Sequence, residues 1–219
     1  MKTIEGKAIV SEQCTTGASA GDENTRCPEN THKGRRILES AMEIFSQKPY
    51  HLVKVEDIAA RAGVGKGTVY EYYRSKEALF RAVFDEGGRI YLRVMEEALN
   101  REGTAVEKFT HLVATHMSFI CQNRQRAILM VAEQRLIAPR ELRQTFMERR
   151  GRLLSLVRET IRQGIREGSF APVDVEFASL FVIGGIISLW PLALSEEKNL
   201  LHDREKEVMD LILKGLSQP

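Results

Sequence analysis

From Lys33 onward the apolar positions of the chain recur with the period of an α-helix. The first stripe stops near Pro49 and consists of Ile37, Leu38, Ala41, Ile44 and Phe45. Two shorter helical segments follow. One ends at Gly63, and the other runs from Gly65 or Lys66 to about Tyr73. No stretch alternates with the period of two that is typical of strands, so the pattern predicts three short helices first.

Longer helices are predicted after Ser75, which is a suitable N-cap with Glu77 in the first turn. The stripe that follows continues to about Gly103, and Gly87-Gly88 interrupts it, which predicts a bend or a split there. Thr104-Ala-Val-Glu107 is a capping box and predicts a new helix to about Asn123.

The remainder of the chain reads as helical as well. We expect helices at 126–136, from Pro139 to Glu167, from Asp174 to Leu192, and from Ser195 through Lys214. The fold class is therefore all-α. Three parts are predicted: a flexible N-terminal tail (1–32), a three-helix segment (33–80) and a larger helical domain (81–219).

Composition narrows the class of protein only a little. The 219 residues carry a formal net charge of +2, and the three cysteines are scattered without a CxxC pair. We therefore expect no disulfide framework, no metal site and no cofactor, and we expect a reducing cytoplasmic setting. The uncharged stretch 177–194 is about long enough to cross a membrane, but it holds two glycines and lacks flanking cations. A helix buried in a core or a subunit interface is the preferred interpretation.

The segment EDIAARAGVGKGTVYEYY, residues 56–73, is typical of a helix-turn-helix. Ala59 is small where two helices would cross, Gly63 permits a left-handed turn residue, and Val64 would reach into the core. On the second helix Val69 and Tyr73 would face inward, and the spacing predicts an outward face made of Gly67, Thr68, Glu71 and Tyr72. An alternative is a simple three-helix packing unit with tyrosines on its rim. Basic residues gather around the segment: Lys33, Arg35, Arg36, Lys48, Lys54, Arg61, Lys66, Arg74 and Lys76.

Residues 37–80 resemble the N-terminal domain of the TetR family of bacterial transcriptional regulators, on the motifs RRILESAMEIFSQ and VEDIAARAGVGKGTVYEYYRSKEALF. The resemblance implies a homodimer on a near-palindromic DNA operator, with the third helix in a major groove. It implies base contacts from Lys66, Gly67, Thr68 and Glu71, and phosphate contacts from Tyr70, Tyr72 and Lys76. Two departures are Gly65 and Lys54, where the family prefers hydroxyl caps; Lys54 either leaves the cap to another group or adds a phosphate contact.

The same resemblance implies an effector cavity and a dimer face in the larger domain. Polar and aromatic residues on apolar faces are the candidate pocket: Tyr91, Met95, His116, Phe119, Met130, Glu133, Phe146 and Trp190. The alternatives are plain core packing for the methionine and aromatic residues, a hydrogen-bonded core histidine for His116, and a surface pair with Arg135 for Glu133. The stock of apolar residues favours a hydrophobic or amphipathic small molecule. Small residues of the penultimate helix would let two subunits approach, and these are Ala178, Gly184, Gly185 and Ser188; the alternative is a helix buried in a monomer.

The predicted function is a homodimeric repressor released from its operator by a small-molecule effector. The alternative is a nucleoid-associated or division-linked DNA-binding protein of the same fold that needs no effector. An enzyme is not expected, because the sequence has no ExxH pair, no GxSxG and no P-loop.

Overall fold

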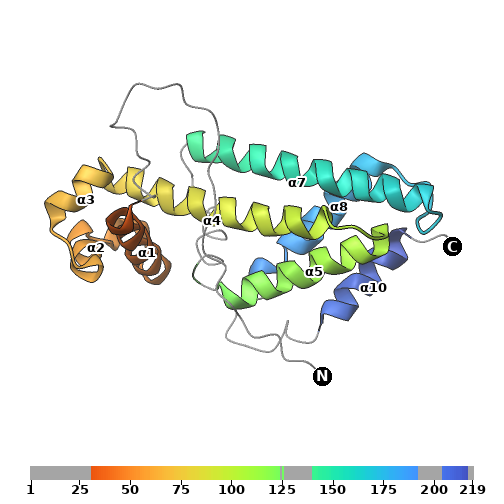
Figure 1. Cartoon of the computed structure of the whole chain (residues 1–219), viewed down its shortest axis with the longest axis horizontal. Helices are drawn as coiled ribbons and strands as arrows, with labels where there is room; N and C mark the ends of the chain where they lie inside the picture. The colour runs from red at the N-terminus through yellow and green to blue at the C-terminus, as the bar shows by residue number, and fades with distance from the viewer. Residues whose placement is uncertain (1–30, 124, 126–139, 192–203, 217–219) are drawn as a thin grey trace.

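The computed structural model describes residues 31–123, 125, 140–191 and 204–216, and the regular structure in these ranges is helical throughout. The molecule is elongated, with a small three-helix unit at one end and a larger bundle at the other (Figure 1). The long helix α4 (Lys76–Leu99) runs from the first part into the second. The predicted all-α class is confirmed.

The three-helix unit consists of α1 (His32–Gln47), α2 (Val55–Ala62) and α3 (Lys66–Tyr72), with a 3-10 turn at Tyr50–Leu52. Helix α1 begins at His32 because the Thr31 side chain accepts a hydrogen bond of 3.0 Å from the Gly34 amide. The apolar stripes of the helices meet in a closed core of side chains, which includes Ile37, Phe45, Ile58, Val69 and Tyr73.

The turn between α2 and α3 has the predicted left-handed glycine, since Gly63 has φ of 63°. The Val64 amide donates to the Ala59 carbonyl at 3.0 Å, which closes the end of α2. The Arg36 guanidinium donates to the Ala62 carbonyl. Arg36, which the sequence suggested as part of a basic surface, therefore caps a helix inside the unit.

Helix α4 begins where Ser75 predicted it, because the Ser75 side chain accepts a hydrogen bond of 3.0 Å from the Ala78 amide. The expected split at Gly87-Gly88 is wrong, since α4 is continuous from Lys76 to Leu99. Both glycines are buried, and a Cβ on Gly88 would lie 2.6 Å from Nη1 of Arg149. The absence of a side chain at Gly88 is explained by the approach of α7, not by a break in the helix.

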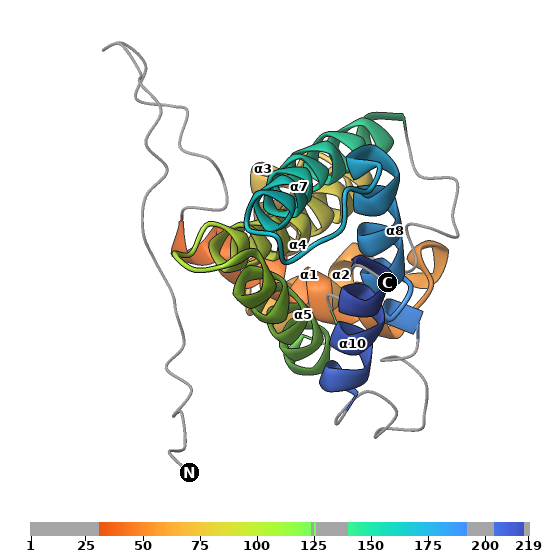
Figure 2. The ribbon, with the colours of Figure 1, turned by 90° about the vertical axis from the view of Figure 1, so that its right-hand side faces the viewer.

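The larger bundle adds α5 (Ala105–Gln122), α7 (Arg140–Arg166), α8 (Val175–Ile187) and α10 (Glu205–Leu216) to α4. Helix α4 packs against α5 and α7, α7 packs against α8, and α5 packs against α10. The end-on view shows these helices around a common centre (Figure 2). The core of the bundle begins at Tyr91 on α4, whereas Phe84 still belongs to the core of the three-helix unit.

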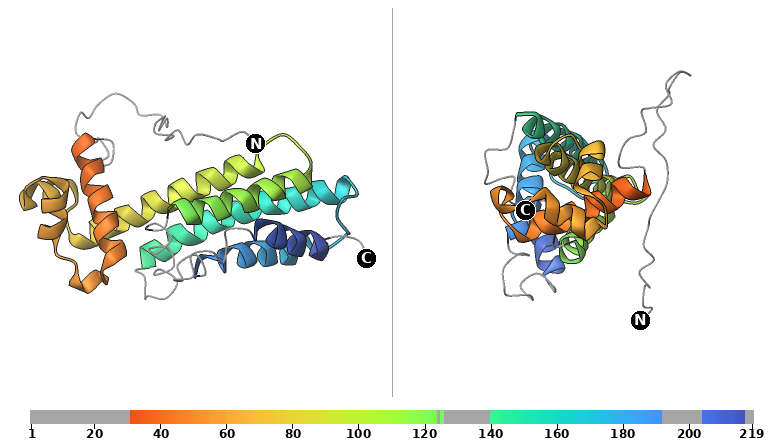
Figure 3. Two further views of the ribbon diagram at one scale, coloured as in Figure 1. Left: turned by 90° about the horizontal axis from the view of Figure 1, so that it is seen from below. Right: turned by 90° about the vertical axis from the view of Figure 1, so that its left-hand side faces the viewer.

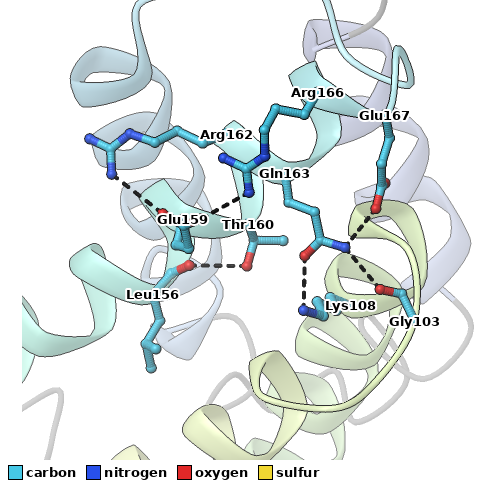
Figure 4. A network of polar contacts seen from close by, with 9 residues as sticks. All are labelled: Gly103, Lys108, Leu156, Glu159, Thr160, Arg162, Gln163, Arg166 and Glu167. Carbon is cyan, nitrogen blue, oxygen red and sulfur yellow. Dashed lines mark hydrogen bonds and ion pairs between the residues drawn. The ribbon is translucent and has the colours of Figure 1, made fainter.

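A polar network fastens the far end of α7 to the turn before α5 (Figure 4). Gln163 Nε2 donates to the Gly103 carbonyl at 2.9 Å, and Lys108 Nζ donates to Gln163 Oε1 at 2.8 Å. The Glu167 carboxylate accepts from the Ala105 amide at 3.0 Å, and this bond lowers the pKa of Glu167. The predicted capping box is present, because Thr104 and Glu107 satisfy each other's backbone amides.

Helix α8 is shorter than the sequence suggested. Asp174 caps it as predicted, accepting from the Phe177 amide at 3.0 Å, but the helix ends at Ile187 and not at Leu192. A turn at 188–189 follows, where the Ser188 hydroxyl donates to the Gly185 carbonyl at 2.6 Å. Within the described ranges no helix is long and apolar enough to span a membrane. The predicted helix 126–136 and the helix starts at Pro139 and Ser195 lie outside the described residues.

Candidate functional site

Helix α3 lies at the extreme end of the molecule, away from the larger bundle (Figure 3, left). Its Val69 is buried in the three-helix core, which fixes how the helix is rotated. Gly67, Tyr70 and Glu71 are exposed on the opposite side, and Thr68 is half-buried between the two faces. A Cβ on Gly67 would meet no atom within 4 Å, so the backbone there is open to a partner.

Lys66 does not project freely from the start of α3. Its Nζ lies 2.6 Å from Oε1 of Glu56 on α2 and 5.9 Å from the centre of the Tyr70 ring. The hydrogen bond to Glu56 raises the pKa of Lys66 and lowers the pKa of Glu56. Both side chains are solvent-exposed, so a phosphate or a base can displace this pair at a small energetic cost.

The three tyrosines of the segment have different environments. Tyr73 is buried, as predicted, and its hydroxyl donates to the Gly34 carbonyl at 3.4 Å. Tyr70 is exposed to 40%. Tyr72, which the helical spacing predicted to face outward, is half-buried against the three-helix core. Of the three tyrosines, Tyr70 therefore offers the most exposed ring to a partner.

Lys76 lies at the start of α4 above the ring of Tyr50, with 4.4 Å between Nζ and the ring centre. Partial burial lowers the pKa of Lys76. The pKa of Tyr50 is raised, first by burial and second by the negative charge of the nearby Glu77. The Tyr50 ring also packs against Phe80, at 4.9 Å between ring centres. This contact holds Lys76 close to the aromatic core, beside the exposed amides of the α4 N-terminus.

Other cations of the three-helix unit divide into two groups. Lys48 pairs with Asp57 at 3.5 Å, and Arg61 pairs with Glu43. The second group forms no ion pair within the described residues and comprises Lys33, Arg35, Lys54 and Arg74. Lys54 is the N-cap residue of α2 and makes no side-chain cap. These cations are available to anions outside the molecule.

Inside the larger bundle, four rings form an aromatic cluster that consists of Tyr91, His116, Phe119 and Trp190. The Tyr91 hydroxyl and His116 Nδ1 share a hydrogen bond of 2.9 Å. Burial raises the pKa of Tyr91 and lowers the pKa of His116 to about 4. The phenol is thus protonated and the imidazole neutral at pH 7, and the tautomer of the ring decides which of the two groups donates in this bond.

His116 Nε2 is the less well satisfied of the two ring nitrogens. The Ile186 carbonyl is near enough to favour the charged ring slightly. Even so, Nε2 has no hydrogen bond of good geometry to any residue in the described part of the chain. His116 is a neutral polar group inside an aromatic core, held from one side by Tyr91.

A small apolar pocket of about 50 Å³ opens between α4, α7 and α8. Of the predicted pocket residues, Tyr91 and Phe146 line it, whereas Met95, His116, Phe119 and Trp190 lie in the bundle core. Met130 and Glu133 lie outside the described residues. The complete lining is Phe84, Gly88, Tyr91, Leu92, Phe146, Arg149, Arg150, Leu153, Ile183 and Ile187.

Sequence reasoning missed the two arginines of this pocket. Arg149 and Arg150 belong to the charged run of an amphipathic helix, where arginines ordinarily face water. Their only sequence signal was their position next to the apolar stripe that contains Leu153. In the described ranges no cluster of acidic, histidine or cysteine side chains could hold a metal ion.

The outer face of α8 is apolar and uncovered in the single chain. Phe177 is 70% exposed and Phe181 71% exposed, and Leu211 on α10 is exposed to 73%. Gly184 and Gly185 on α8 are exposed as well, and so is Ser188 directly after it, whereas Ala178 is half-buried against the bundle's own core. Exposed phenylalanines next to glycines are typical of a surface that another protein covers.

A helix-turn-helix with an exposed second helix, joined by one long helix to a bundle with a pocket, defines a DNA-binding transcriptional regulator. The family described as "Bacterial regulatory proteins, tetR family" matches residues 37–83. The "Tetracyclin repressor-like, C-terminal domain" matches residues 102–190. The chain belongs to the TetR family of bacterial transcriptional regulators.

The relatives of this chain include regulators of fatty acid metabolism. The chain is 28% identical over 188 residues to the fatty acid metabolism regulator protein of Bacillus subtilis, covering 84% of this chain and 95% of that protein. The solved fatty acid degradation regulator FadR from Bacillus halodurans is 26% identical, with a TM-score of 0.75 over 87% of this chain and 99% of that chain. FadR from Bacillus subtilis in complex with stearoyl-CoA is 27% identical, with a TM-score of 0.72 over 83% of this chain and 98% of that chain.

Proposed function

We propose that this regulator is a homodimeric repressor that acts on DNA in the cytoplasm and leaves its operator when a long-chain acyl-CoA binds. The observation that carries the proposal is the exposed face of α3 at one end of a chain whose other end contains an apolar pocket. Helix α4 joins the two, which gives the pocket a mechanical route to the DNA-binding end.

In this proposal Lys66, Gly67, Thr68 and Glu71 read base edges in the major groove. The exposure of Gly67 and Glu71 supports this role, and Lys66 must first leave Glu56. Phosphate contacts come from Tyr70, Lys76 and Lys54, and from the exposed part of Tyr72. The unpaired cations of the three-helix unit add sequence-independent attraction.

The proposed dimer forms through α8 and α10, as a four-helix interface across a two-fold axis. The exposed Phe177, Phe181 and Leu211 support it, since burial of these side chains against a partner would remove apolar surface from water. Gly184, Gly185 and Ser188 then allow close approach of the two α8 helices. Ala178 lies at the margin of this face, because it already packs against its own chain.

The dimer can be tested by Phe181→Glu, which puts a charge at the centre of the proposed interface. We expect a monomer by light scattering and loss of operator binding, since two half-sites about 34 Å apart require two linked recognition helices. Met147→Glu is the matched control, because Met147 is 59% exposed and belongs to α7, not to the two proposed interface helices. A Phe181→Glu protein that remains dimeric would refute the interface.

The proposed effector class rests on two supports. A relative of 27% identity has been solved with stearoyl-CoA, and the first-named relative regulates fatty acid metabolism. The pocket lining of this chain is apolar apart from two arginines, which suits an acyl chain with an anionic end.

The DNA contacts can be tested on a duplex selected from random sequences by the purified protein. We expect Lys76→Ala to weaken binding to all duplexes alike and to reduce the salt slope by about 1. Glu71→Ala should change the preferred base at one position, with little change in the salt slope. If Glu71→Ala lowered affinity equally for every base, its proposed reading role would be wrong.

The second candidate function is a DNA-binding protein of the same fold that needs no effector. The small size of the pocket favours it, because about 50 Å³ does not hold an acyl chain unless side chains move. Thermal unfolding with and without palmitoyl-CoA separates the two candidates. A repressor with this effector should show a melting temperature that rises with ligand concentration, and the second candidate should show no such rise.

A further inference from the structure

Two neighbouring arginines of α7, Arg149 and Arg150, border a pocket whose remaining lining is apolar. Both side chains are partly exposed, whereas Tyr91, Leu153 and Ile183 in the same lining are buried. The arginines therefore lie at the solvent-facing part of the pocket, together with the half-buried Leu92, Phe146 and Ile187, and the buried apolar groups lie deeper. This polarity matches a ligand with a charged head and an apolar tail.

Arg150 has a buried donor that nothing in the described part of the chain satisfies. Its Nε is shielded from solvent and has no hydrogen-bond partner among the described residues, and the guanidinium forms no ion pair there. Buried polar atoms are satisfied in the large majority of cases, so an unsatisfied guanidinium nitrogen beside a pocket calls for a partner from outside. A planar cation with several donors suits a phosphate or a carboxylate.

Arg149 is held beside the pocket by two features of α4. Its Nη2 lies 3.1 Å from Oδ1 of Asp85, which joins α7 to α4. Its Nη1 lies over Gly88, where a Cβ would be only 2.6 Å away. The guanidinium of Arg149 therefore occupies a space that only a glycine leaves open, and its present partner is a carboxylate that another anion could replace.

We propose that Arg149 and Arg150 bind the anionic head of the effector, and that this head competes with Asp85 for Arg149. The proposal deepens the proposed function and rests on it. The ligand class is a single long acyl chain that ends in an anion. Two sources share this chemistry: the phosphates of an acyl-CoA and the carboxylate of a free fatty acid.

The same contact explains how binding would reach the DNA. The pocket is too small for an acyl chain as it stands, so a tail that enters between Leu153 and Tyr91 moves α7 relative to α4. An anion on Arg149 removes the Asp85 bond that opposes this movement. Phe84, which lines the pocket, also packs in the core of the three-helix unit, so a shift of α4 at this point reaches the helices that bind DNA.

The test measures affinity by titration calorimetry on the full-length protein, with palmitoyl-CoA, palmitate, hexadecanol and coenzyme A alone. We expect a charged palmitoyl probe to bind more tightly than hexadecanol, and coenzyme A alone to bind weakly. Arg149→Gln and Arg150→Gln should each lower the affinity for the charged probe by about tenfold to a hundredfold, which is the loss typical of one charge-assisted hydrogen bond. Their affinity for hexadecanol should stay unchanged.

Arg152→Gln is the matched control, because Arg152 lies on the same helix, carries the same charge and pairs with Glu96 away from the pocket. If Arg149→Gln and Arg150→Gln lowered the affinity for palmitoyl-CoA no more than Arg152→Gln does, the proposed arginine site would be wrong. The proposed effector class would then still hold. If the wild-type protein bound none of the palmitoyl probes, the effector class itself would fail, and the arginine site with it. Palmitate and palmitoyl-CoA compared with each other identify the source of the anion.

Gly88→Ala provides a second variant that keeps every charge. The added methyl group would meet the flexible end of Arg149, so we expect the fold to tolerate it while the guanidinium is displaced. This variant should lower the affinity for palmitoyl-CoA and leave the affinity for hexadecanol unchanged, as we expect for Arg149→Gln. Asp85→Asn should have the opposite effect and raise the affinity for the charged palmitoyl probe several-fold, because the carboxylate that competes for Arg149 is removed. No change in Asp85→Asn would refute the competition.

Discussion

The three-helix unit and the larger bundle are both helical, but they differ in where their polar and apolar groups lie. In the three-helix unit the apolar side chains close around Ile58 and Val69, and the charged side chains face water. In the larger bundle a neutral histidine lies inside, at His116, while Phe177 and Phe181 lie outside. The first region is complete in one chain, and the second leaves surfaces that suit a partner and a ligand.

This difference follows from what each region must contact. A unit that meets DNA needs an outer face of polar groups and a rigid interior, which the α2–α3 turn supplies through Gly63 and Arg36. A bundle that binds an apolar molecule needs space and mobile side chains in its interior. The predictions below test whether the two regions behave separately.

The largest expected effect comes from one truncation in each core. Phe45→Ala and Phe109→Ala each remove a buried ring and should each cost about 3–5 kcal/mol of local stability. Phe109→Ala should lower the main melting transition, whereas Phe45→Ala should abolish DNA binding and leave the dimer and the main transition nearly intact. Urea unfolding by circular dichroism, with light scattering, checks both variants.

Leu52→Ala is the control for this pair, because Leu52 is 58% exposed in the three-helix unit and should change stability by less than about 0.5 kcal/mol. A loss of the dimer in Phe45→Ala would contradict the separation of the two cores.

A smaller effect is expected from the buried histidine when the pH falls. Burial holds the pKa of His116 at about 4 in the folded chain, below its ordinary value of 6.5, so the unfolded state takes up the proton first. The stability due to neutral His116 is complete above pH 6.5 and is lost between pH 6.5 and 4. At pH 5 the loss should be about 2 kcal/mol, and His116→Gln should not show it.

The measurement is the free energy of unfolding at pH 7 and pH 5 for the wild-type protein and for His116→Gln. Glutamine can still form a hydrogen bond with Tyr91, as donor or acceptor, but does not titrate, and every carboxylate contribution is common to both proteins. An equal pH dependence in the two proteins would mean that His116 is not buried in its neutral form.

The smallest effects concern helix caps, which the two regions use differently. Thr104 caps α5 with its side chain, whereas Lys54 at the start of α2 does not. Thr104→Ala should destabilise the larger bundle by about 1 kcal/mol, and Lys54→Ser should stabilise the three-helix unit by up to about 1 kcal/mol. If Lys54 contacts phosphate, Lys54→Ser should also lower the salt slope of DNA binding by about 1. Unfolding and filter binding at several salt concentrations measure these effects, and an unchanged stability of Thr104→Ala would contradict the first of them.

Local chemistry made much of the fold predictable from the sequence. Ser75, Thr104 and Asp174 each begin a helix where a hydroxyl or carboxylate can accept from a backbone amide, and Gly63 ends one in the left-handed region. The core positions of α3 followed from the spacing of Val69 and Tyr73. Caps and helical periodicity act over three or four residues, so they can be read without knowledge of the rest of the chain.

The site was predictable only where it belongs to one helix. The outward positions of Gly67 and Glu71 follow from the buried Val69, whereas Tyr72 turned out to be half-buried, because the helices that pack beside it were not known. The pocket was predicted less well. Tyr91 and Phe146 line it, but Met95 and Trp190 are core residues.

The amino-acid sequence by itself determined the all-α class, the helix-turn-helix and the caps that begin α4, α5 and α8, because these depend on neighbours along the chain. Only the tertiary structure decided that α4 runs unbroken through Gly88, that α8 ends at Ile187, and that Arg149 and Arg150 border a pocket. The physical reason is distance along the chain. Arg149 lies above Gly88 and beside Asp85, some sixty residues earlier, and such an approach depends on how whole helices pack.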